Sequence, residues 1–141
     1  MMFGMKKTPA AVALQRFARQ LDAERIKYSV SDDNAVVRIL YNGDNFKSLT
    51  FTFVFDHDGK SVGIRVFSIA QFTSAQLEDA YEFCNRMNDH YRWLRFYVDE
   101  DRELTAALDA VIPADSVGEI CVELLHRSVS IVDSVCEELN S

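Results

Sequence analysis

The 141-residue sequence predicts an α+β domain of two layers, in which helices pack on one face of a mostly antiparallel sheet. Two observations predict this class. Apolar residues recur at helical spacing in three segments, near residues 8–26, 74–90 and 116–139. Between these segments lie five main runs of β-branched and aromatic residues, first three and then two, separated by turns. The predicted order is α-βββ-α-ββ-α, and we expect residues 1–141 to form a single domain.

The first helix should begin at Thr8 and Pro9, because proline suits the first helical turn, where its missing N–H breaks no hydrogen bond. Behind it, small and apolar residues recur at helical spacing: Ala10, Leu14, Phe17, Ala18 and Leu21. A short extended piece at residues 28–30 follows. The next three strands, near residues 36–41, 49–55 and 61–69, are joined by turns rich in Asn, Asp and Gly, which predicts a meander.

The second half predicts a helix, two strands and a closing helix. Thr73 with Gln76, and Ser116 with Glu119, have the spacing of capping boxes at the two helix starts. The residues 93–98 and 104–112 are predicted strands on either side of an acidic turn at 99–102. In the second of these strands one face is apolar (Leu104, Ala106, Leu108, Ala110 and Ile112) and the other carries Glu103, Thr105 and Asp109. This alternation is typical of a half-buried antiparallel strand.

Charge and composition exclude several classes of partner. The net charge of −7 disfavours DNA, RNA and anionic lipid, because binding to phosphates depends on clustered Lys and Arg. The basic residues near the first helix would form at most a small patch: Lys6, Lys7, Arg16, Arg19 and Arg25. No run approaches the ~20 apolar residues that a membrane span needs. We therefore expect no nucleic-acid or membrane partner.

The cysteines and the start of the chain predict a cytoplasmic protein. Cys84, Cys121 and Cys136 are widely spaced and lie in the apolar stripes of predicted helices, which indicates buried free thiols in a reducing compartment. At the start of the chain, the charges follow the apolar residues, and the next segment is an amphipathic helix rather than the core of a signal peptide.

No group of residues has the pattern of a catalytic, metal or nucleotide site. The three histidines, His57, His90 and His126, fall in different elements, whereas a zinc site needs clustered ligands. Acidic residues gather in tight turns, where Asp usually bonds to the backbone. The sequence thus predicts a non-enzymatic protein with no cofactor. One alternative is a small enzyme whose site is assembled from turn residues such as Asp56, His57 and Asp99; another is a structural dimer subunit of a larger assembly.

The solvent side of the sheet offers a candidate binding surface. If Leu94 and Phe96 face the core, alternation places the residues between and around them on the opposite side. The predicted partner-binding residues are Trp93, Arg95, Tyr97, Arg65 and Phe67. Trp, Tyr and Arg are the usual anchors of protein interfaces. The alternative is that a helix, or an unusual strand pairing, covers this face within the monomer.

The element order, with an acidic turn between two strands and a long closing helix, resembles the YbjN family of bacterial sensory transduction regulators. The resemblance is best over Asn85 and Asn88, Leu94 to Asp101, and Ala110 to Leu139. It implies the fold of type III secretion chaperones and a small cytoplasmic module that binds a protein partner, chaperone-like or as a regulatory adaptor, as a homodimer. It implies no catalytic residues. The two asparagines are themselves interpreted as caps of the helix end.

Overall fold

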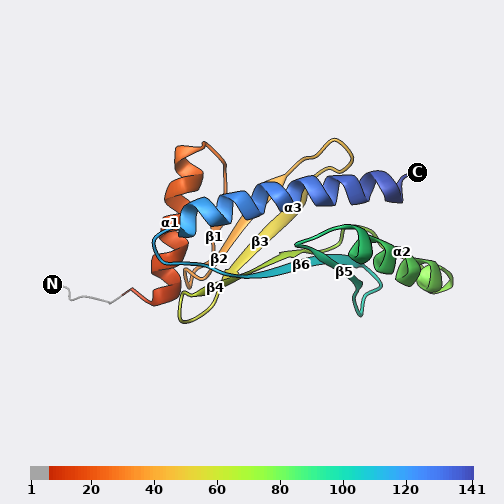
Figure 1. The fold of residues 1–141 in the computed structure, drawn as a ribbon, viewed down its shortest axis with the longest axis horizontal. Coiled ribbons are helices and arrows are strands. Elements are labelled where there is room, and N and C mark those ends of the chain that lie inside the picture. Colours follow the sequence, from red (N-terminus) through yellow and green to blue (C-terminus); the bar gives the residue numbers. More distant parts are fainter. Residues whose placement is uncertain (1–6) are drawn as a thin grey trace.

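A single six-stranded sheet with three helices on one face makes up the computed structural model, which describes residues 7–141 (Figure 1). The predicted Lys6 contribution to a basic patch, and the start of the chain, lie outside these residues. The elements are α1 (Pro9–Ala23), β1 (Ser29–Val30), β2 (Val36–Tyr41), β3 (Leu49–Phe55), β4 (Ser61–Val66), the 3-10 turn η1 (Ser74–Gln76), α2 (Leu77–His90), β5 (Arg95–Val98), β6 (Leu104–Val111) and α3 (Val117–Leu139).

The sheet has the strand order β1-β2-β3-β4-β6-β5, and every neighbouring pair is antiparallel. The predicted α+β class and element order are therefore confirmed. The extended piece at residues 28–30 adds a sixth strand of only two residues at one edge. Two strands are shorter than predicted, since β4 ends at Val66 and β5 begins at Arg95.

Capping explains two of the three helix starts. The hydroxyl of Thr8 accepts a hydrogen bond from the backbone N–H of Ala11 (3.1 Å), and Pro9 occupies the first turn of α1. Before α2, the N–H of Thr73 donates to the side-chain oxygen of Gln76 (2.9 Å), as in a capping box.

The capping box predicted for α3 is wrong. Ser116 has φ −138° and ψ 23°, and its side chain makes no capping hydrogen bond. Its hydroxyl lies 3.4 Å from the carboxylate of Asp115. The extended backbone that lets a serine reach back to the first helical N–H groups is missing here. Glu119 remains in the first turn of α3, where its charge suits the helix dipole.

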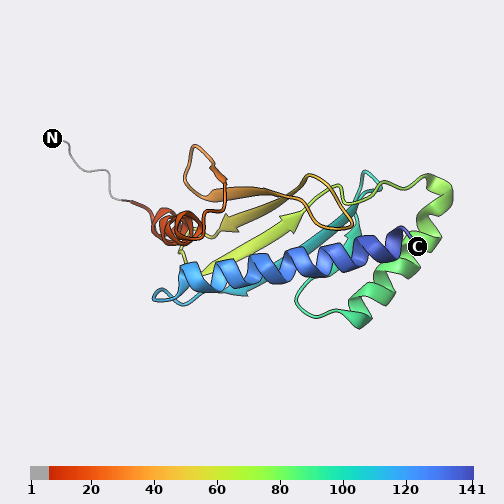
Figure 2. The ribbon, with the colours of Figure 1, turned by 90° about the horizontal axis from the view of Figure 1, so that it is seen from above.

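The core lies between the helices and one face of the sheet. In β3 the residues Leu49, Phe51, Phe53 and Phe55 point into it, and they share one cluster with apolar residues of all three helices. The ring of Phe17 on α1 lies 4.6 Å from that of Phe53. Figure 2 shows α3 running along the sheet, with α1 near its beginning and α2 near its end.

All three cysteines are free and buried in this core, as their helical positions predicted. Burial raises the pKa of each thiol, to about 12 for Cys121 and to about 11 for Cys136, where the charge of Asp133 adds to the effect of burial. The thiolate is the form that attacks a thiol reagent, and it is both scarce and inaccessible here.

We therefore expect the native protein to show no fast-reacting thiol towards Ellman's reagent at mildly alkaline pH. The same protein in guanidinium chloride should react at all three cysteines. A fast-reacting thiol in the native state would contradict the packing described for Cys84, Cys121 and Cys136.

Candidate functional site

The face of the sheet opposite the helices is largely exposed, although Thr105 and Ala107 of β6 are buried on that side. Residues alternate with the core-facing ones along each strand, so that Thr50, Thr52 and Val54 of β3 lie on this side. Throughout residues 7–141, no helix packs on it (Figures 1 and 2). We call this surface the open face; its strand residues include Arg38, Leu40, Thr52, Val54, Gly63, Arg65, Arg95, Tyr97, Ala107, Asp109 and Val111. A helical cover, one of the two alternatives predicted for this side, is thus absent from the part of the chain that the structure describes.

Three arginines form a row across the open face. Cross-strand partners place five residues side by side across the sheet. In the order β2, β3, β4, β6 and β5, these residues are Arg38, Thr52, Arg65, Ala107 and Arg95. Each arginine is thus two strands from the next, which corresponds to about 10 Å between their backbones. We call these three residues the arginine row.

Asp109 joins two members of the row. Its carboxylate accepts hydrogen bonds from Nη1 of Arg65 (3.0 Å) and from Nη1 of Arg95 (3.2 Å). Burial alone would raise the pKa of Asp109, but the hydrogen bonds and charges of Arg65 and Arg95 outweigh it and hold the pKa below its usual value. The carboxylate therefore stays ionised and aligns the two guanidinium groups.

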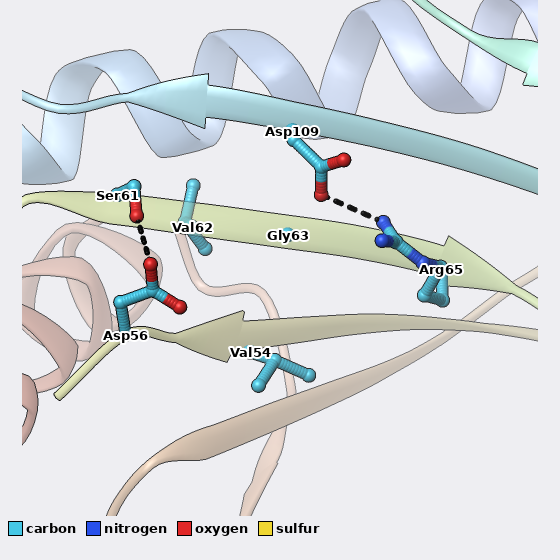
Figure 3. Close-up of a pocket in the computed structure, with 7 residues that line it drawn as sticks. All are labelled: Val54, Asp56, Ser61, Val62, Gly63, Arg65 and Asp109. Carbon is cyan, nitrogen blue, oxygen red and sulfur yellow. Dashed lines mark hydrogen bonds and ion pairs between the residues drawn. The ribbon is translucent and has the colours of Figure 1, made fainter.

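A hollow in the open face lies beside this cluster. It has a volume of about 300 Å³ and is lined by Val54, Asp56, Ser61, Val62, Gly63, Arg65 and Asp109 (Figure 3). Gly63 lies in the middle of β4 and is not in the left-handed region, so the backbone does not require glycine there. A Cβ at this position would lie 3.0 Å from a carboxylate oxygen of Asp109. The missing side chain is what leaves room for the hollow.

Exposed apolar residues surround the hollow and the arginine row. The exposed fractions are 65% for Leu40, 41% for Val54, 39% for Tyr97 and 81% for Val111. Phe67, one residue beyond the end of β4, is 52% exposed. An apolar patch rimmed by charged residues is typical of a surface that contacts another molecule.

Arg65, Arg95 and Tyr97, three of the five predicted partner-binding residues, share the open face. The prediction that Trp93 shares it is wrong. Trp93 lies before β5 with φ +76°, and its ring packs 5.0 Å from the guanidinium carbon of Arg127 on α3, in the helical layer. The alternation argument assumed that the strand already began at Trp93, whereas the left-handed backbone there turns the side chain away.

Alternation placed Gly63 and Asp109 on the non-core sides of their strands, but sequence reasoning did not include them among the partner-binding residues. Gly63 did give a signal, because a glycine inside a strand often marks a place where another group approaches the backbone. The ion pairs of Asp109 gave none, since its two arginine partners come from other strands.

The residues of the alternative enzymatic site are not brought together. Asp56 directly follows the end of β3 and accepts a hydrogen bond from the hydroxyl of Ser61, the first residue of β4. Asp99 lies at the other end of the sheet, where its carboxylate accepts from the N–H groups of Asp101 and Glu103 and the hydroxyl of Thr105. The eight residues of β6 separate these ends by roughly 25 Å. Within residues 7–141, no three His, Cys, Asp or Glu side chains gather as a metal site would require.

Asn88 closes one edge of the sheet. Its amide nitrogen donates to the carbonyl of Phe96 (3.1 Å), and its amide oxygen accepts from the N–H of the same residue (2.7 Å). The interpretation of Asn88 as a helix cap is wrong, because its side chain bonds to β5 and the helix continues to His90, with Tyr91 as the C-cap. Since β5 is an edge strand, this bond occupies backbone groups that another strand could otherwise pair with. The flat face, rather than this edge, is left for contacts.

Comparisons with known proteins bear on the identity of the chain. None of the described helices is long and apolar enough to cross a membrane. No curated protein matches the sequence. A crystal structure from E. coli, of "YbjN, a putative transcription regulator", is similar with a TM-score of 0.64 and 10% identity over 90% of each chain, which shows a shared fold. The family model YbjN, described as "Putative bacterial sensory transduction regulator", matches residues 13–140. Since that match spans nearly the whole sequence, the chain belongs to the YbjN family, as the sequence resemblance predicted.

Proposed function

We propose that this protein is a non-enzymatic regulatory module of the cytoplasm that acts by binding another polypeptide on its open face. The observation that carries the proposal is the hollow at Gly63, which lies on an uncovered sheet face beside aligned arginines and exposed apolar side chains. The family description, a regulator, agrees with a role in binding.

The composition of the open face suits a protein interface. Arginine and tyrosine contribute much of the binding energy at interfaces, and both are present as Arg95 and Tyr97. Arg65 and Arg95 are already held by Asp109, so their ordering costs little on binding. The hollow does bring Asp56, Arg65 and Asp109 together, but despite burial the pKa of Asp109 is lowered by its two arginine partners, whereas a general acid or base needs a pKa near the working pH.

Substituting Gly63 by valine tests the proposal. The new side chain should fill the hollow and lower affinity for the partner by tenfold or more, about 1.4 kcal/mol. Its close neighbours are the ends of the Asp109 and Arg65 side chains, which can shift. Because glycine inside a strand costs roughly 0.5–1 kcal/mol, stability should stay the same or rise. Calorimetry with the purified partner and a thermal melt measure the two effects separately.

The partner for this measurement can be found by photo-crosslinking in the source bacterium. A photoreactive residue at Tyr97 should capture it, whereas the same residue at Tyr81 should not. Tyr81 is a matched control because it is also an exposed tyrosine (56%) but lies on α2, in the helical layer. Capture at Tyr81 alone, or full affinity in the Gly63→Val variant, would contradict the proposal.

Self-association is a second expected property, proposed from the fold resemblance. We expect a two-fold dimer that leaves part of the open face exposed, with an interface near the usual ~800 Å² per chain. Tyr97→Ala should weaken it by about 1–4 kcal/mol, because interface anchors lose binding when truncated. Tyr81→Ala should leave it unchanged. Light scattering over a concentration series measures this, and a wild-type monomer at every concentration would refute it.

A further inference from the structure

The arginine row is a positive strip on a protein whose net charge is −7. Its three arginines, Arg38, Arg65 and Arg95, stand against the single carboxylate of Asp109, which leaves two positive charges along the row. Two further carboxylates of this side flank the row, Asp56 at the hollow and Asp99 against Thr105. A partner that presents carboxylates is attracted to the row and repelled by most of the remaining surface, which orients it.

The arginine row keeps unused hydrogen-bond donors. Arg95 donates to Asp109 through Nη1 only, and Arg65 also uses Nη1 alone, for Asp109 and for two backbone carbonyls. A guanidinium has five N–H donors, so both groups can donate hydrogen bonds to a further carboxylate. Arg38 is exposed and makes no hydrogen bond or ion pair with any residue from 7 to 141. It is the member of the row to which no carboxylate is hydrogen-bonded within these residues, although, together with a hydrogen bond from Ser31, its charge helps to lower the pKa of Asp33.

The hollow itself favours an apolar side chain. Its rim carries the carboxylates of Asp56 and Asp109, which would repel a third one, while Val54 and the bare backbone of Gly63 form an apolar floor. The open face therefore offers a site for an apolar side chain next to a row of cationic groups.

Resting on the proposed function, we propose that the partner of the open face is an acidic polypeptide segment. Its carboxylates pair with the arginine row, and one of its apolar side chains enters the hollow at Gly63. Nucleic acid fits this surface less well, because Asp109 lies between two of the three arginines and phosphate binding needs denser positive charge. A second copy of the chain fits the arginine row and the hollow less well too, because it would bring two arginine rows together, so the dimer expected above must leave the row and the hollow exposed.

The test uses three synthetic probes and two matched variants. The probes are a capped peptide of alternating glutamate and leucine, the same peptide with lysine for glutamate, and one with serine for leucine. The variants are Arg38→Glu, on the open face, and Arg19→Glu, which makes the same charge change at an exposed position of α1. Neither arginine has an ion pair that its loss would break within the described residues.

We expect the glutamate–leucine peptide to bind most tightly, with an affinity that falls as salt is raised. Arg38→Glu should weaken it by about tenfold or more, as loss of an interface charge does. Arg19→Glu should leave it nearly unchanged. The lysine–leucine peptide should bind the wild type poorly and Arg38→Glu better. Gly63→Val should weaken the glutamate–leucine peptide more than the glutamate–serine peptide.

Other outcomes overturn the inference and separate it from the proposed function. Peptide binding could be lost in Gly63→Val and yet be unaffected by salt or by Arg38→Glu. That result would support the open face as a binding surface but would refute an acidic partner. Equal losses in Arg38→Glu and Arg19→Glu would mean attraction by overall charge only and would also refute it. Tighter binding of a single-stranded DNA oligonucleotide, or loss of peptide binding at the concentrations where light scattering shows a dimer, would assign the face to another occupant. If none of the three peptides binds, the acidic segment is refuted, while photo-crosslinking at Tyr97 still decides the proposed function.

Discussion

Replacing Phe17 by alanine is expected to lower the free energy of unfolding by about 3–5 kcal/mol. The side chain is 0% exposed and lies against Phe53 at 4.6 Å and Phe55 at 6.1 Å between ring centroids. It is the contact through which α1 packs on β3. Its removal leaves a cavity that the surrounding rings can fill only in part. The decrease in the free energy of unfolding therefore includes both the transfer free energy of the ring and the van der Waals contacts that it made.

Urea unfolding followed by circular dichroism measures this loss, and Phe67→Ala is the matched control. The same atoms are removed there, but Phe67 is 52% exposed, so its stability change should stay within about 0.5 kcal/mol. The two variants should also differ in binding, because Phe67 lies beside the open face and Phe17 does not. Similar losses of stability in both variants would show that the assignment of core and surface is wrong.

Asn88→Asp is expected to cost about 1–3 kcal/mol near neutral pH. The new carboxylate can still accept a hydrogen bond from the N–H of Phe96. It has no donor for the carbonyl of Phe96, which the Asn88 amide nitrogen reaches at 3.1 Å, and it places a carboxylate oxygen against that carbonyl oxygen. The matched control is Asn85→Asp, an exposed asparagine one turn earlier on α2 with no side-chain hydrogen bond in the described chain. It makes the same charge change near the helix end and should cost no more than about 0.5 kcal/mol.

The pH dependence of the Asn88→Asp deficit gives a second readout. The carbonyl of Phe96 favours the protonated form of the new carboxyl, so its folded-state pKa lies above the ordinary Asp value of about 3.9. The loss in free energy of unfolding is complete above the folded-state pKa. It becomes smaller as the pH falls through that pKa, because protonation restores a donor. Stability curves of wild type and variant should therefore converge towards acidic pH. A deficit that does not change with pH would mean that the hydrogen bond to Phe96 is not its cause.

Elements whose signals are local could be predicted from the sequence. The alternation of β3 and the helical stripes of α1, α2 and α3 depend only on which residues are apolar and how they are spaced, and all of them form as expected. The cap at Thr8 lies within the four residues from Thr8 to Ala11. Such signals act within one or two turns of chain, so no tertiary contact is needed to recognise them.

The wrong predictions concern side chains that contact residues far away in the sequence, or a backbone conformation that the residue spacing does not reveal. Asn88 looked like a helix cap, yet its hydrogen bonds go to a strand that the chain reaches only after a further turn. Trp93 was assigned by alternation, yet its backbone is left-handed and its ring lies against Arg127, 34 positions later in the sequence. Ser116 had the right spacing for a cap but the wrong backbone.

By itself, the sequence determined the fold class, the order of elements, the burial of the thiols and the membership of the YbjN family, because each follows from residue types and their spacing along the chain. Only the tertiary structure decided the candidate surface. Antiparallel pairing sets residues from β2, β4, β6 and β5 side by side, and only then do three separate arginines become a row, with Asp109 and the gap at Gly63 beside them. Strand register is a long-range property, and no local pattern in the chain records it.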